Sequence, residues 1–324
     1  MSVQPTIAIL GGGVAGMSCA LWLKNLGFKP IILEKNTCLG GQLTTLSTIN
    51  LWVLGFSQHT SQQLADIYSQ HIQSTDISVY YSCQLLEIQQ NRLGFQMVIQ
   101  KNTLSPETLS IKALIIATGA RPLGYEVIEN IEGFTPELIS NRVFFSPTDH
   151  LKQLPHLSAK TIAILGGGDN AHYTAKDIAA TADKIHLIMR SSATAQTLIR
   201  DDISTLIQQN KIIEHAHATI TRIYPVKNKI ALKLTQSGGL NQTLFVDKIF
   251  IRCGFTANTE FLKNSELLTH VATDKHYILT DKVKRTNIPG IYAIGDVTNS
   301  DDPSVVNALA EGALAARDVS QHLN

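Results

Sequence analysis

The heptapeptide IAILGGG occurs twice in this chain, beginning at Ile7 and again at Ile162. The letters TIAIL lead into both glycine clusters, and apolar residues recur three and four positions apart after both. An apolar run bounded by turn residues is typical of a buried parallel strand, and the later spacing is typical of a helix. A second apolar run follows each helix, at residues 30–35 and 185–190. Each copy therefore predicts a strand, a glycine turn, a helix and another strand in succession.

The spacing of the small residues indicates what such a turn could bind. They are Gly11, Gly13 and Gly16 in the first copy and Gly166, Gly168 and Ala171 in the second. The first position allows a tight turn, the second lets a pyrophosphate approach the backbone, and the third needs a small residue where helix meets strand. The helix N-terminus then offers unpaired N–H groups to the phosphates. We therefore predict two dinucleotide-binding sites.

The two copies differ where the adenosine ribose is expected. Glu34 ends the second strand of the first copy, as suits a carboxylate that binds ribose hydroxyls. The corresponding residue in the second copy is Met189, followed by Arg190 and Ser191. A carboxylate would repel a 2′-phosphate, whereas an arginine can bind one. The first site is expected to hold FAD or NAD and the second NADPH, unless Arg190 is an ordinary solvated cation.

The repetition continues beyond the glycine turns. Each half adds several alternating strands and closes on a strand that ends at Thr118–Gly119 or Cys253–Gly254. The prediction is an α/β chain with two Rossmann-like, three-layer ββα dinucleotide-binding domains, the second inserted in the first. The FAD-binding domain is expected at residues 1–120 and 256–324, and the NAD(P)H-binding-like domain at residues 121–255.

Composition narrows the range of partners. The 324 residues carry a net charge of +1, so nothing indicates a nucleic-acid partner. No apolar run reaches the roughly 18–20 residues that a membrane helix needs, and the N-terminus lacks the basic region of a signal peptide. The four cysteines are scattered, which indicates reduced thiols in the cytoplasm. His215 and His217 could pair on a metal, but no third ligand accompanies them, so we expect none.

Six motifs together show a family resemblance. They are GGGVAG (11–16), LGGQLTT (39–45), LIIATGARP (114–122), ILGGGDNA (164–171), GFTANTEFL (254–262) and GIYAIGDVT (290–298). With these motifs in this order over nearly its whole length, the chain resembles the flavoproteins with two dinucleotide-binding domains. Within them it is similar to the branch of low-molecular-weight thioredoxin reductases and thioredoxin-reductase-like ferredoxin/flavodoxin–NADP reductases. The resemblance implies FAD, NADPH or NADH, and a homodimer.

The resemblance also implies site residues. For FAD these are Gly11, Gly13, Ala15, Gly16, Glu34, Lys35, Gly41, Gln42, Leu43, Asn50, Leu85, Thr118, Gly119, Gly295 and Asp296. For NAD(P)H they are Gly166, Gly168, Asp169, Asn170, Ala171, Arg190 and Ser191. Asp296 would bind the ribityl chain, and the helix that begins near Pro303 would point its N-terminus at the flavin pyrimidine ring. No side chain is assigned with certainty to catalysis, because the flavin itself performs the chemistry.

Three departures from the family pattern qualify these expectations. The redox-active C-x-x-C of thioredoxin reductases is missing, since residues 141–154 contain no cysteine. The usual His-Arg-Arg clamp and its later arginine read Met189-Arg190-Ser191 and Ala195, so NADH becomes an alternative to NADPH. The usual Asn-aromatic-Pro-Gly-Phe reads WVLGF from Trp52, which would place this tryptophan beside the flavin or in the core.

These features predict a cytoplasmic, FAD-dependent NAD(P)H oxidoreductase. Electrons would pass directly to a ferredoxin- or flavodoxin-like carrier or a small molecule, because no dithiol is available. One alternative is an oxidoreductase that uses no pyridine nucleotide and holds another ligand, even a second flavin, near His172 and Tyr173. We otherwise expect these two side chains to face solvent. The other alternative is a flavin-binding sensor or interaction module with little turnover.

Overall fold

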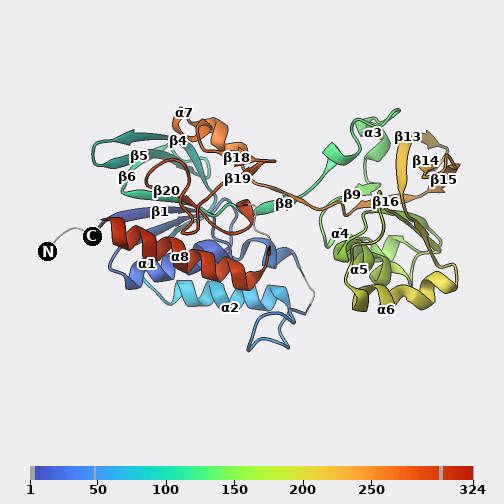
Figure 1. The fold of residues 1–324 in the computed structure, drawn as a ribbon, viewed down its shortest axis with the longest axis horizontal. Coiled ribbons are helices and arrows are strands. Elements are labelled where there is room, and N and C mark those ends of the chain that lie inside the picture. The colour runs from blue at the N-terminus through green and yellow to red at the C-terminus, as the bar shows by residue number, and fades with distance from the viewer. Residues whose placement is uncertain (1–3, 47–48, 299–301, 324) are drawn as a thin grey trace. The chain divides into compact units, whose positions relative to one another are not determined.

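The computed structural model describes residues 4–46, 49–298 and 302–323. The chain divides into two compact units, the first made of Met1–Arg121 with Thr256–Asn324 and the second of Pro122–Phe255. Figure 1 shows that each unit contains a central sheet with helices on one face and further strands on the other. The assignment of FAD to the first unit and NAD(P)H to the second stays a prediction.

The first unit is built on a five-stranded parallel sheet with the order β20-β7-β1-β2-β3. Its strands are β1 (Thr6–Leu10), β2 (Lys29–Leu33), β3 (Ser78–Tyr80), β7 (Ala113–Ile116) and β20 (Ile291–Ala293). Helices α1 (Val14–Asn25), α2 (Ser61–Gln73) and α8 (Val305–Leu323) lie on one side (Figure 1). An antiparallel sheet of β4 (Cys83–Asn91), β5 (Gly94–Lys101) and β6 (Glu107–Ile111) lies on the other.

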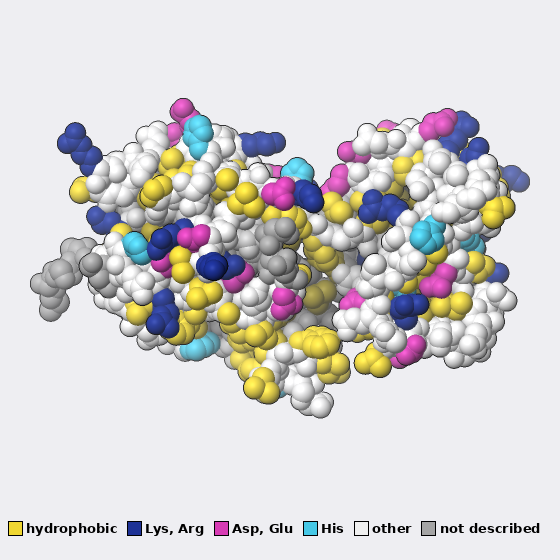
Figure 2. Space-filling model, viewed as in Figure 1, with side chains coloured by type: hydrophobic (Ala, Val, Ile, Leu, Met, Phe, Trp, Pro, Cys, Tyr) yellow, Lys and Arg dark blue, Asp and Glu magenta, His cyan; other side chains and the backbone are white. Residues whose placement is uncertain are grey.

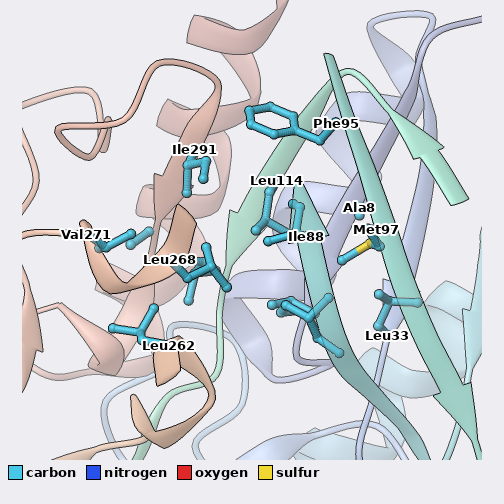
Figure 3. Packing of buried hydrophobic residues seen from close by; sticks show 14 of the residues in the cluster. Ala8, Leu33, Ile88, Phe95, Met97, Leu114, Leu262, Leu268, Val271 and Ile291 are labelled. Atoms are coloured by element: carbon cyan, nitrogen blue, oxygen red, sulfur yellow. The ribbon is translucent and has the colours of Figure 1, made fainter. Parts of the chain in front are cut away.

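Alternation along β1 explains these three layers. Ile7 and Ile9 pack into the cluster that contains the core residues of α1 and α8. Ala8 and Leu10 point to the opposite face, because successive side chains of a strand alternate. Figure 3 shows that second cluster, where residues of the parallel sheet meet Met97 and its neighbours on β4 and β5. Burying a large apolar side chain contributes about 1.5–3 kcal/mol, so both faces of the sheet stabilise the unit.

The second unit repeats this architecture. Its parallel sheet has the order β12-β11-β10-β16-β9. The strands are β9 (Val143–Phe144), β10 (Thr161–Leu165), β11 (Lys184–Ile188), β12 (Ile212–His215) and β16 (Lys248–Ile251). Helices α5 (Asp169–Ile178) and α6 (Thr197–Gln208) share one core cluster with the sheet, and β13 (Ala218–Val226), β14 (Lys229–Gln236) and β15 (Asn241–Val246) share the other. The predicted fold class is confirmed.

The remaining elements are short. Besides short 3-10 helices such as Gly41–Thr45, they are β8 (Ala120–Pro122), β17 (Phe255–Ala257), β18 (Thr273–Asp274), β19 (Tyr277–Ile278), α3 (Pro136–Ile139), α4 (Asp149–Gln153) and α7 (Glu266–Thr269). Strands β8 and β17 pair with each other where the chain leaves and re-enters the first unit. Within the described ranges, no helix combines the length and the apolarity that a bilayer span requires.

Candidate dinucleotide-binding sites

The first glycine turn is packed too closely for side chains at two of its positions. A Cβ on Gly11 would lie 2.3 Å from the carbonyl oxygen of Ala117, and a Cβ on Gly16 would lie 2.0 Å from that of Gly11. Both contacts are far inside van der Waals distance, so only glycine fits. At Gly13 the nearest atom to such a Cβ is the Cα of Gly41, at 3.9 Å. The turn is therefore closed against the protein at its ends and open at its centre, where a pyrophosphate would approach.

Helix α1 begins directly at this open position. Gly13 is its N-cap residue and makes no side-chain cap, and the first turn of the helix contains no acidic residue. The first N–H groups of a helix have no acceptor within it, and they carry the positive end of the helix dipole. The start of α1 can thus bind an anion.

Glu34 is held beside the turn by the backbone. Its Oε2 accepts a hydrogen bond from the Gly12 amide and its Oε1 accepts one from the Asn36 amide, both at 2.7 Å. The side chain is only 4% exposed. A carboxylate has about four lone-pair sites, so two remain for ribose hydroxyls. Lys35, the next predicted FAD residue, is exposed.

A second loop lies against the first turn. The Gly40 amide donates to the carbonyl oxygen of Gly12 at 2.9 Å, and a Cβ on Gly41 would lie 3.1 Å from the Cα of Gly13. Beyond Gly41, Gln42 donates through its side-chain Nε2 to Oδ2 of Asp296 at 3.0 Å and to the Ala120 carbonyl at 3.1 Å. The structure therefore brings together residues that were predicted to lie beside the flavin and that are far apart in the sequence.

The loop that carries Asp296 is fixed by a buried glutamate. Glu311 of α8 accepts the Gly295 amide through Oε2 and the Lys284 ammonium through Oε1, both at 2.6 Å. Gly295 packs on α1, because a Cβ there would lie 2.9 Å from the Cβ of Ala15. Burial raises the pKa of Asp296, and the nearby Glu311 carboxylate raises it further. Asp296 is thus a poorly solvated carboxyl that a hydroxyl donor would stabilise.

The end of β7 is fixed by an asparagine that the site prediction did not include. Asn258 Nδ2 donates to the Thr118 carbonyl and the Thr118 hydroxyl donates to the Asn258 carbonyl, both at 2.8 Å. The Asn258 amide also donates to the carbonyl of Gly119 at 2.9 Å. Asn258 lies within the motif at 254–262, which could have identified it as a site residue. No motif of the sequence identifies Glu311 in this way.

Other predicted FAD residues lie in different surroundings. The side chains of Leu43 and Leu85 are buried in core clusters. Asn50 accepts the amide of Trp52 through Oδ1 at 3.1 Å. Trp52 is 73% exposed, so the alternative that it packs in the core is wrong, and its place beside a flavin stays a prediction. The exposed apolar residues of this loop also include Ile49, Leu51 and Leu54.

The second glycine turn has the same shape with different chemistry around it. A Cβ on Gly166 would lie 2.1 Å from the carbonyl oxygen of Arg252, so this turn is equally closed. Ala171 is fully buried at the position of the first turn's third glycine. Met189 occupies the place of the glutamate, with Cγ 3.4 Å from where a Cβ on Gly167 would lie. Among the described residues, Met189 rather than a carboxylate thus stands where the ribose of the second turn is expected.

The loop after β11 folds over this second turn. The Thr194 and Ala195 amides donate to the carbonyl of Gly167 at 2.8 and 3.0 Å. The Asp169 carboxylate accepts the backbone and side-chain N–H groups of Gln196, each at 2.9 Å. The predicted residues Asn170, Arg190 and Ser191 are exposed.

The histidines of the second unit are arranged differently from the prediction. His172 is fully buried rather than solvent-facing, with Nδ1 3.0 Å from the Gly168 carbonyl, whereas Tyr173 is 38% exposed. His215 does not pair with His217, because its Nε2 lies 2.9 Å from Nδ1 of His186. Within the described ranges, no three His, Cys, Asp or Glu side chains are grouped as metal ligands.

The described cysteines are all unpaired. Cys19 and Cys83 belong to the clusters on opposite faces of the first sheet, and Cys253 lies in the other unit. Burial raises the pKa of Cys19 strongly and that of Cys83 to about 11. These two thiols are therefore protonated at neutral pH and poor nucleophiles. Cys38 is exposed.

Charges of both signs are interspersed on the face shown in Figure 2, and hydrophobic side chains gather on the loop drawn below α2.

The family model for the pyridine nucleotide-disulphide oxidoreductases matches residues 5–312. The chain belongs to this family. Among curated proteins, it is 26% identical over 319 residues to one component of the alkyl hydroperoxide reductase of Staphylococcus aureus. That match covers 96% of this chain and 57% of the component, so the chain spans little more than half of that relative.

Other relatives match over nearly their whole length. Thioredoxin reductase of Buchnera aphidicola is 24% identical, with 98% of this chain and 97% of that protein covered. The solved thioredoxin reductases of Lactococcus lactis and T. acidophilum give TM-scores of 0.81 and 0.80 at 22% and 23% identity. Each covers 98% of this chain, and 98% and 99% of the solved chains are covered. These likenesses establish the two-domain oxidoreductase fold of this family member.

Proposed function

We propose that this oxidoreductase binds FAD in its first unit, binds NADPH or NADH in its second, and passes electrons directly from FAD to an acceptor. The contact between Gln42 and Asp296 carries the proposal, because it joins two predicted flavin-binding segments beside the open centre of the first turn. When bound, FAD would accept a hydride and release electrons onward. The acceptor would be a ferredoxin- or flavodoxin-like carrier or a small molecule.

The residues of the first unit fit FAD. The open position at Gly13 would admit the pyrophosphate, and the N–H groups at the start of α1 would bind it. Glu34 would accept ribose hydroxyls with the lone pairs that its two backbone bonds leave unused. Asp296 would accept a ribityl hydroxyl, which would relieve the desolvation that raises its pKa. The residues of the unit would thus bind and orient the cofactor.

The residues of the second unit fit a nicotinamide dinucleotide without excluding a 2′-phosphate. Met189 replaces the carboxylate that would repel the phosphate, and the exposed Arg190 supplies a cation nearby. An exposed arginine contributes little fixed binding energy by itself, so we expect NADPH to be preferred only modestly over NADH.

The positions of the thiols favour a route without sulfur. No two cysteines in the 324 residues have the C-x-x-C spacing. Cys19 and Cys83 are buried on opposite sides of a sheet, so they cannot approach each other to form a disulfide. Their raised pKa values also disfavour the thiolate that attacks a disulfide. We therefore place the flavin itself next to the terminal acceptor.

An acceptor screen tests the proposal. The FAD-loaded full chain is mixed with NADPH or NADH and with ferricyanide, a quinone, a ferredoxin, a flavodoxin or an oxidised thioredoxin. We expect turnover with one-electron or quinone acceptors and none with thioredoxin. Disulfide turnover would contradict the proposal.

A flavin-to-protein ratio near two would favour the diflavin alternative, and one flavin that neither nucleotide reduces would favour a sensor. The expected homodimer is checked separately by light scattering.

A further inference from the structure

We propose that His172 is a positioning residue of the second dinucleotide-binding turn. Its imidazole fixes the peptide unit that joins Gly168 to Asp169, and so orients the Asp169 N–H toward the bound pyrophosphate. This inference rests on the proposed use of the second unit for a nicotinamide dinucleotide. His172 is not one of the positions that define the glycine-turn pattern.

The carbonyl oxygen of Gly168 is surrounded by donors. It lies 3.1 Å from the Ala171 amide, 3.3 Å from the His172 amide and 3.0 Å from His172 Nδ1. Because a carbonyl oxygen only accepts, the proton of this bond must lie on Nδ1. The imidazole is fully buried, so it cannot move away from this carbonyl without disturbing the core of α5.

Fixing the Gly168 carbonyl also fixes the orientation of the Asp169 N–H. The peptide unit is planar and trans, so the C=O of Gly168 and the N–H of Asp169 point in opposite directions. Asp169 is the first residue of α5, and its N–H has no acceptor within the helix. The imidazole on the protein side therefore holds this N–H on the outer side of the turn, where phosphate oxygens would bind.

The first unit serves as an internal comparison. There the turn is braced by Glu34, which accepts the Gly12 amide, and the residue corresponding to His172 is the apolar Met17. In the second unit Met189 replaces the glutamate, which removes that brace. The histidine supplies a hydrogen bond from the helix side instead. Glu34 thus holds the first turn from the strand side, and His172 holds the second turn from the helix side.

The other imidazole nitrogen distinguishes this role from that of an ion pair. Nε2 is buried and has no hydrogen-bond partner among the described residues. It lies 4.0 Å from Oε1 of Glu214, beyond hydrogen-bond distance. The hydrogen bond from Nδ1 therefore orients the turn, and Glu214 serves as a control position.

Variants of His172 test the inference. His172→Asn keeps a donor near the position of Nδ1, His172→Gln moves it toward the position of Nε2, and His172→Met copies the first unit. We expect His172→Met and His172→Gln to weaken NADP⁺ and NAD⁺ binding about fivefold, the effect of losing one hydrogen bond. His172→Asn and the control Glu214→Gln should stay within about twofold of the unchanged chain. Calorimetry on the FAD-loaded full chain measures both affinities, and its flavin content reports folding.

Hydrogen exchange gives a second readout that needs no nucleotide. Peptides spanning residues 166–172 should exchange faster in His172→Met than in the unchanged chain or His172→Asn. Equal affinity and equal exchange in all the variants would overturn the inference. If the unchanged chain binds neither nucleotide, the proposed function fails, and the exchange rates still decide the role of His172. If His172→Met does not fold, equal behaviour of the Asn and Gln variants overturns the inference.

Discussion

The backbone amide of Gly12 donates a hydrogen bond to Oε2 of Glu34, at an N···O distance of 2.7 Å. This bond holds the carboxylate beside the first turn before any ligand arrives. We expect Glu34→Gln to weaken FAD binding at least about tenfold, since hydrogen bonds to charged groups contribute about 1.5–3 kcal/mol. Equilibrium dialysis of FAD measures this effect. The exposed Glu87→Gln serves as the control, and equal affinities of both variants would contradict the assigned role.

The choice between NADPH and NADH should depend on the loop after β11. Arg190→Ala is expected to weaken NADP⁺ binding about fivefold and NAD⁺ binding hardly at all, because only the former carries a 2′-phosphate. Met189→Glu should reverse any preference, since a carboxylate at this position repels that phosphate. Calorimetric titration with both nucleotides provides the measurement. Arg200→Ala, at an exposed position on α6, should change neither affinity.

The second unit should lose stability in acid. His186 and His215 are both buried, and burial, with a smaller effect of the neighbouring imidazole and of Lys184, lowers the pKa of His186 to about 4. An unfolded histidine has a pKa of 6.5, so the unfolded chain binds more protons between these values. Stability therefore falls as the pH decreases from about 6.5 to about 4, by about 2–3 kcal/mol.

Hydrogen exchange in β11 and β12, corrected for intrinsic rates, measures this loss. His186→Phe should flatten the pH dependence in part, because it removes one of two titrating imidazoles; burial also lowers the pKa of His215. His217→Gln should leave it unchanged, since His217 is exposed. An equally steep dependence in the His186 variant would show that other groups cause it.

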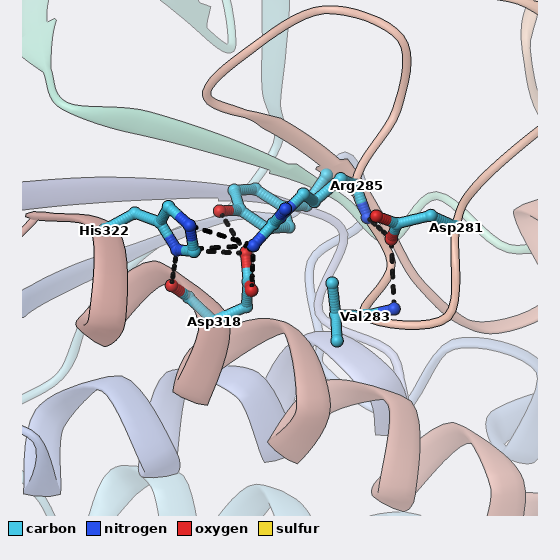
Figure 4. A network of polar contacts seen from close by, with 6 residues as sticks. Asp281, Val283, Arg285, Asp318 and His322 are labelled. Carbon is cyan, nitrogen blue, oxygen red and sulfur yellow. Dashed lines mark hydrogen bonds and ion pairs between the residues drawn. The ribbon is translucent and has the colours of Figure 1, made fainter.

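A buried aspartate connects α8 to the loop before β20 (Figure 4). Asp318 accepts Arg285 Nε at 2.7 Å, Arg285 Nη2 at 2.5 Å and the Tyr292 hydroxyl at 2.8 Å. The guanidinium holds the pKa of Asp318 below its usual range. Asp318→Asn should destabilise the first unit by about 2 kcal/mol, less than a fully buried pair because Arg285 is partly exposed.

Urea unfolding, monitored by the release of flavin, measures that change in stability. His322→Gln is the matched control, because His322 touches the same network from an exposed position. A loss of stability as large in the His322 variant would contradict the assignment to Asp318.

Local pattern was sufficient to predict the duplicated fold. The TIAIL strands and glycine turns can be recognised from neighbouring residues alone, and their apolar alternation indicates both faces of each sheet. The contacts of Glu311 and Asn258 join segments far apart in the sequence, and only the second fell within a motif. The burial of His172 was missed because a single histidine on a helix has no periodicity that separates a core side from a solvent side.

Anaerobic reduction of the full chain is the most direct test of whether a flavin in the first unit takes electrons from a nicotinamide nucleotide. Purified protein supplemented with FAD is freed of excess cofactor and titrated with NADPH and then NADH, while the visible flavin absorbance is followed. We predict one tightly held flavin per chain that either nucleotide bleaches. A protein that retains no FAD, or whose bound flavin stays oxidised with both nucleotides, would contradict this account.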